Sequence, residues 1–135
     1  MSYSRATALQ AALFASLSGD AELALLVPGG VHDAPPPGTP QGTYVVLGAE
    51  EVIDRSDVSG PGAEHRVLIS VLSDAAGFAT AKAAAERVGA ILSATPPALA
   101  QGRIVAIWFH TATARKDDAG NVRRVDLRFR VRIEA

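Results

Sequence analysis

The last stretch of the chain carries the most regular hydrophobic pattern in the sequence. From residue 124 to residue 134 apolar and charged side chains alternate strictly, which places the two kinds on opposite faces of a strand. The apolar positions are Val125, Leu127, Phe129, Val131 and Ile133. The charged positions are Arg124, Asp126, Arg128, Arg130, Arg132 and Glu134. We therefore predict a strand over residues 122–133 with one face in the core and one charged face.

Three further segments have the composition of strands, at residues 44–53, 65–73 and 103–114. The middle one is apolar on both faces, which is typical of a central strand or of one whose outer face meets another subunit. The last one is also predicted to have two apolar faces. Val105, Ile107 and Phe109 form one face, and Ile104, Ala106 and Trp108 form the other. The polar turn at residues 117–121 predicts a hairpin into the final strand.

Two segments show the three- and four-residue spacing of amphipathic helices. The first, residues 4–18, continues into a short second piece that Asp20 caps and Pro28 ends. The second helix follows Asp74 and ends before Pro96. The order of the main elements is helix, two strands, helix, two strands. We predict an α+β fold, a mainly antiparallel four-stranded sheet with two main helices packed on one face.

Composition narrows the classes of function. A length of 135 residues fits one domain, residues 1–135, and a net charge of -1 argues against a general nucleic-acid binder. The chain has no cysteine, which excludes disulfides and thiolate metal sites. The first residues lack the pattern of a signal peptide, and no apolar run is long enough to span a bilayer. We therefore expect synthesis in the cytoplasm and no membrane partner.

No residue pattern in the sequence indicates catalysis. His32, His65 and His110 are too dispersed for a ligand motif, so we expect surface or strand-edge histidines and no metal site. Phosphate-binding glycine motifs and a serine nucleophile motif are missing, so we predict no cofactor and no enzyme activity. The alternative is a small oligomeric α+β enzyme or ligand-binding domain, which would require a concave pocket with convergent polar groups.

Two parts of the chain are candidate contact surfaces. The first is the arginine row, which we define as Arg124, Arg128, Arg130 and Arg132. Three interpretations of the row remain open: a solvated face that discourages edge-to-edge aggregation, a subunit or partner interface, and nucleic-acid contact. The second is the polar loop of residues 54–63, which includes Arg55, Asp57 and Val58, because loops of this length in a small domain are often functional or ordered only by a partner.

Four stretches that cover nearly the whole chain share a family pattern. Residues 8–27, ALQAALFASLSGDAELALLV, form an opening helix with a short continuation. Residues 31–51, VHDAPPPGTPQGTYVVLGAEE, form a proline-bearing segment that leads into a strand. Residues 62–92, GAEHRVLISVLSDAAGFATAKAAAERVGAIL, form a strand and an alanine-rich helix, and residues 103–134 form the final hairpin. Together they resemble the tail-completion, or tail terminator, family of long-tailed phages and prophages. The alanine- and arginine-rich composition also resembles the copies in gene transfer agents.

The resemblance implies a structural protein without enzyme activity. Such proteins form a homohexameric ring on the completed tail tube, stop its polymerisation and present a surface to the head connector. The implied partners are further copies of the chain, the tail tube protein and the head–tail connector or stopper protein, with passing contact to DNA in the channel. The implied location is the host cytoplasm during assembly and then the neck end of the tail. The alternative within the same particle is a head-completion or neck protein.

In a ring-forming protein the arginine row becomes a candidate subunit or lumen surface. Charge reversal at both Arg128 and Arg130 is then expected to impair assembly and to leave the monomer folded, because the row lies on the charged face and outside the core. Sedimentation of the purified double variant, with circular dichroism to monitor folding, measures both effects. Normal assembly of the double variant would make the row a solvated face only.

Overall fold

The computed structural model describes residues 5–58, 60–94, 96–117 and 121–134. Its elements, in chain order, are α1 (Ala6–Ser18), α2 (Ala21–Leu26), β1 (Val31–His32), β2 (Tyr44–Asp54), β3 (Gly62–Ser73), α3 (Ala79–Ser93), β4 (Arg103–Asp117) and β5 (Val122–Glu134). The predicted α+β class is confirmed. Residues 118–120 of the predicted hairpin turn lie outside the described residues. No helix in the described part of the chain is long and apolar enough to cross a membrane.

The strands form one sheet in the order β1-β2-β3-β5-β4. All neighbouring pairs are antiparallel except β1 and β2. The prediction of four strands was wrong because β1, two residues long, is too short to show a periodic pattern. The N–H of Gly29 donates to the carbonyl oxygen of Thr43 at 2.9 Å, and a Cβ at Gly29 would lie 2.9 Å from that oxygen. The missing side chain thus lets this segment approach β2.

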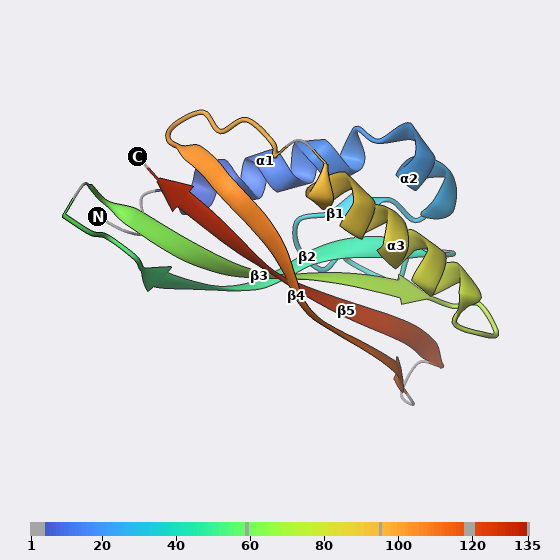
Figure 1. Cartoon of the computed structure of the whole chain (residues 1–135). Helices are drawn as coiled ribbons and strands as arrows, with labels where there is room; N and C mark the ends of the chain where they lie inside the picture. The colour runs from blue at the N-terminus through green and yellow to red at the C-terminus, as the bar shows by residue number, and fades with distance from the viewer. Residues whose placement is uncertain (1–4, 59, 95, 118–120, 135) are drawn as a thin grey trace.

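The helices lie together on one side of the sheet (Figure 1), as predicted. The core between the layers is formed by leucines of α1, by small and branched residues of α3 and by alternate residues of the strands. The alternation predicted for β5 is confirmed, because its five apolar side chains are at most 6% exposed. Burial of one such side chain contributes roughly 1.5–3 kcal/mol, so this strand is a major part of the core.

Edge strand β4 departs from the predicted alternation. Its register with β5 shifts at Val105 and again at His110, where bulges insert an extra residue. Ile104 therefore shares the core-side face with Ile107 and Phe109. The predicted grouping of Val105 with those two residues was wrong, and Val105 is exposed. A bulge changes the face of every later residue, and alternation alone does not reveal it.

Asp20 joins the short helix α2 to α3. Its side chain caps α2 by accepting a hydrogen bond from the Leu23 N–H at 2.8 Å. The guanidinium of Arg87 donates to both oxygens of the same carboxylate, at 2.9 and 2.8 Å. The hydrogen bonds from Arg87 and from the Leu23 N–H stabilise the charged form and lower the pKa of Asp20 from 3.8 to about 2.

The first prediction from the fold concerns the pH dependence of this pair. Asp20→Asn keeps a capping oxygen and removes the charge. Wild type is expected to be more stable than the variant above pH 3.8, and the advantage is expected to disappear as the pH falls from 3.8 towards about 2, because the carboxylate is protonated in the folded state only there. Urea unfolding at stepped pH measures the difference.

Asp20→Ala is the matched control, because it loses the cap as well as the ion pair and should remain less stable than Asp20→Asn. A stability difference between wild type and Asp20→Asn that persists unchanged at pH 2 would contradict the assignment.

Candidate assembly surface

The structure places the arginine row on the face of the sheet opposite the helices. Register pairs Arg128 with Leu68 and Arg130 with Arg66 of β3, on the face that alternates with the buried residues of both strands. The arginines lie on this face because the alternate residues of β5 are buried on the opposite face. Its four members nevertheless have different surroundings.

Arg124 belongs to a largely buried polar cluster. Its Nε donates to Asp126 Oδ1 at 2.8 Å and its Nη2 donates to Ser70 Oγ at 3.2 Å. The Ser70 hydroxyl donates to the same Asp126 oxygen at 2.6 Å, and Ser70 and Asp126 are both buried. Burial raises the pKa of Asp126, but the hydrogen bonds from Ser70 and Arg124 outweigh it and hold this pKa below its ordinary value. Arg124 therefore stabilises the sheet rather than offering its charge to a partner.

Arg130 and Arg132 are also engaged within the chain, whereas Arg128 is not. Arg130 Nη2 donates to His110 Nδ1 at 3.0 Å, and Arg132 Nη2 donates to the carbonyl oxygen of Arg55 at 2.8 Å. Arg128 is exposed and makes no hydrogen bond or ion pair within the described ranges of the chain. Arg128 is thus the member of the row whose charge has no partner among the described residues.

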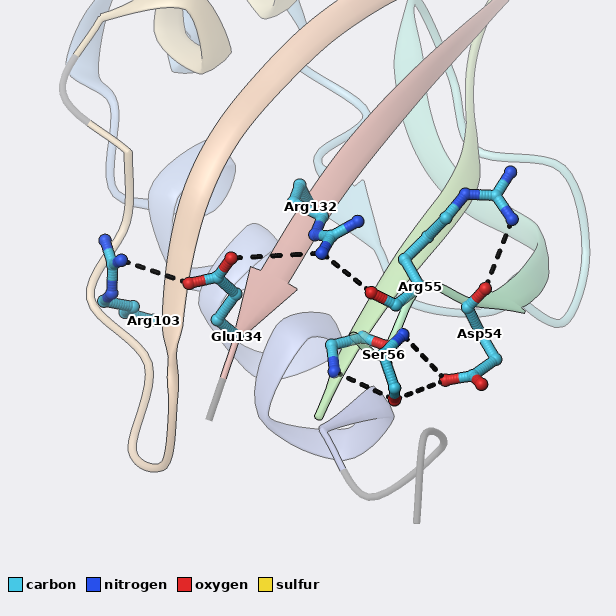
Figure 2. A network of polar contacts seen from close by, with 7 residues as sticks. Asp54, Arg55, Ser56, Arg103, Arg132 and Glu134 are labelled. Atoms are coloured by element: carbon cyan, nitrogen blue, oxygen red, sulfur yellow. Dashed lines mark hydrogen bonds and ion pairs between the residues drawn. The ribbon is translucent and has the colours of Figure 1, made fainter. Parts of the chain in front are cut away.

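The second candidate surface, the loop of residues 54–63, is attached to the end of the arginine row (Figure 2). The hydrogen bond from Arg132 to the Arg55 carbonyl joins β5 to this loop. Glu134 lies 3.9 Å from Arg132 and 3.2 Å from Arg103 of β4, so one row of polar contacts crosses from the loop to the edge strand. A Cβ at Gly62 would lie 3.1 Å from Arg132 Nη2, so glycine leaves room for this guanidinium.

Hydrogen bonds inside the loop shape its tip. Ser56 Oγ donates to Asp54 Oδ1 at 2.7 Å and accepts from the Gly62 N–H at 3.2 Å. Asp57 and Gly60 exchange backbone hydrogen bonds of 3.0 and 3.2 Å. Val58, between them, is fully exposed. The loop therefore presents an apolar side chain at the tip of a hydrogen-bonded turn.

Sequence reasoning did not find the partners of the row. Ser70, His110 and the Arg55 carbonyl lie on other strands or loops, and their pairing with the arginines depends on the register of the sheet. Only Ser70 left a signal, as a polar residue inside an otherwise apolar strand. Such a residue, when buried, requires a hydrogen-bond partner.

The expectation that all histidines lie at the surface or at a strand edge was wrong for His65. This side chain is fully buried, and its Nδ1 lies 2.9 Å from Glu50 Oε2. His65 is buried because it lies on the same face of central strand β3 as the core residues Val67 and Ile69. His32 and His110 do lie on edge strands. Among the described residues no three metal-ligating side chains come together.

Arg128 makes no hydrogen bond or ion pair among the described residues, and Val58 is an exposed apolar residue at the loop tip. Residues 11–134 match the family model of tail completion protein gp17. A chain in a solved structure titled "Virion of native gene transfer agent (GTA) particle" is 52% identical, with a TM-score of 0.91 and coverage of 99% of this chain and 100% of that chain. No curated protein sequence matches the chain.

The chain belongs to the tail completion protein gp17 family. It is a structural component of a phage-like tail and not an enzyme, in agreement with the resemblance found in the sequence.

The surface generates a sharper prediction than the double charge reversal. If Arg128 lies in a contact between subunits, Arg128→Glu alone is expected to weaken self-association by about tenfold or more, because it reverses a charge there without disturbing any bond inside the described part of the chain. Thermal unfolding of the monomer should change little, since the side chain is exposed. Analytical ultracentrifugation measures the association.

Arg128→Lys is the control, because it keeps the positive charge at the same exposed position. Equal association of Arg128→Glu and wild type would leave the row as a solvated face.

Proposed function

We propose that this protein is the tail terminator of a phage-like or gene transfer agent particle. In this proposal a homohexameric ring caps the completed tail tube, stops its polymerisation and joins it to the head connector. The observation that carries the proposal is the 52% identity, over the full length of both chains, to a chain of a gene transfer agent virion. The family match over residues 11–134 supports the tail-completion role independently.

A ring requires two different complementary surfaces on each subunit, because its contacts are heterologous and must close. The chain offers several surfaces that suit this requirement. Arg128 is exposed and unpaired among the described residues, and Val58 is exposed at the loop tip. On β4, Trp108 is 51% exposed and Phe109 is 60% exposed, on opposite faces of the strand. Aromatic residues and arginine are enriched in the centres of protein interfaces.

The partners in this proposal are further copies of the chain, the tail tube protein and the head–tail connector or stopper protein. If the arginine face lines the channel, its contact with passing DNA is electrostatic and independent of base sequence. Assembly takes place in the host cytoplasm, and the finished ring lies at the neck end of the tail.

Deletion of the gene followed by electron microscopy of the particles tests the proposal. Tails of uncontrolled length that are not attached to heads are expected, because nothing stops tube growth or presents a surface to the connector. Expression of the wild-type gene in trans should restore joined particles of defined length. Normal particles from the deletion strain would reject the proposal, and tails of normal length with defective heads would assign the protein to the neck instead.

A further inference from the structure

An apolar groove lies between α3 and the part of the sheet formed by β4 and β5. Its volume is about 370 Å³. The side chains along it are small, branched or aromatic and include Ala85, Phe109, Ala112, Ala114, Leu127 and Phe129. The groove exists because the small side chains of β4 leave this sheet surface open, and Phe109 stands 60% exposed at its edge.

Charge is confined to one side of the groove. Lys82 and Glu86, one turn apart on α3, are the charged residues in its lining. An apolar floor with one cation and one anion at the rim suits an apolar side chain that has both charge signs beside it. It does not suit a polar small molecule, which needs several convergent polar groups.

The tip of the loop between β2 and β3 has that chemistry. Val58 is fully exposed, and Arg55 and Asp57 stand close before it in the sequence. A single exposed valine is ordinary in itself. Here the backbone hydrogen bonds between Asp57 and Gly60, and the one from Arg132 to Arg55, fix the described backbone on either side of Val58. Docking such a preorganised tip costs little conformational entropy.

The tip and the groove of one chain cannot meet. The hairpin tip lies beside the end of β5, where Gly62 pairs with Glu134. The groove is centred near Leu127, seven residues back along β5. At about 3.3 Å per residue this separation is roughly 23 Å. Figure 1 shows the β2–β3 connection and α3 towards opposite ends of the sheet. The tip can therefore reach such a groove only on a second copy.

We propose that the Val58 loop tip of one subunit docks into the α3–β4 groove of the next. Val58 buries its side chain beside Phe109 and Ala112, and the charged end of the loop lies at the rim of the groove, near Lys82 and Glu86. Because the two surfaces differ, the contact is heterologous and repeats head to tail until the ring closes. The inference rests on the proposed ring and identifies which two surfaces form it.

Cross-linking in assembled particles tests this contact. The sequence contains no cysteine, so the full chain with Val58→Cys and Ala112→Cys carries two unique thiols. A short bis-maleimide reagent is expected to join them between subunits into a ladder that extends beyond dimers on denaturing gels. Either single variant should give no ladder. Leu25→Cys with Ala112→Cys is the matched control, because Leu25 is 86% exposed but lies on α2, outside the tip and the groove.

A second variant covers the case in which the double cysteine chain does not assemble. Val58→Asp should reduce the yield of head-joined tails by about tenfold or more, because a charge would enter the apolar groove. Leu25→Asp should retain the wild-type yield. A wild-type yield from Val58→Asp, or joined particles of the double cysteine chain without any ladder, would overturn the docking. Neither result would affect the proposed capping role, which fails only if deletion of the gene leaves normal tails.

Discussion

The structure depends most on the burial of alternate apolar side chains along β5. This strand lies between β3 and β4, and its core-side residues pack with those of both long helices in one hydrophobic cluster. Burial of these side chains fixes the register, because a slip of one residue would move the arginine row into the core and the apolar row into water. The same register brings Ser70 to Arg124 and the β2–β3 loop to Arg132. Burial of the core-side residues of β5 thus determines which side chains meet on the outer face of the sheet.

The arginine face is therefore partly structural and partly free. Three of its guanidinium groups make contacts that hold neighbouring strands or the loop, whereas Arg128 is unengaged among the described residues. An ordered face of this kind suits association, because side chains that are already fixed lose little freedom when a partner arrives. The apolar groove on the other face supplies a second and chemically different surface. A closed ring needs such a pair of surfaces.

Periodicity predicted what depends on local pattern: the long helices, the long strands and the buried face of β5. It did not predict β1, which forms through the close approach of Gly29 to β2, or the bulges at Val105 and His110. The buried position of His65 could be predicted from the sequence, because alternation along β3 places this residue on the core-side face. The local sequence did not predict the different contacts of Arg124, Arg130 and Arg132, because these contacts depend on partners from other strands or from the β2–β3 loop. Similarly, the apolar groove depends on the placement of α3 beside the small side chains of β4.

The proposed role of this chain is to form the ring that ends the tail. Cryo-electron microscopy of purified particles tests it most directly, because it locates the chain and resolves its neighbours. A homohexameric ring of this fold is expected between the last ring of the tail tube and the head connector, with each subunit contacting the next through two different surfaces. Density for this fold at another place in the particle, or as an isolated monomer on the tail, would contradict it.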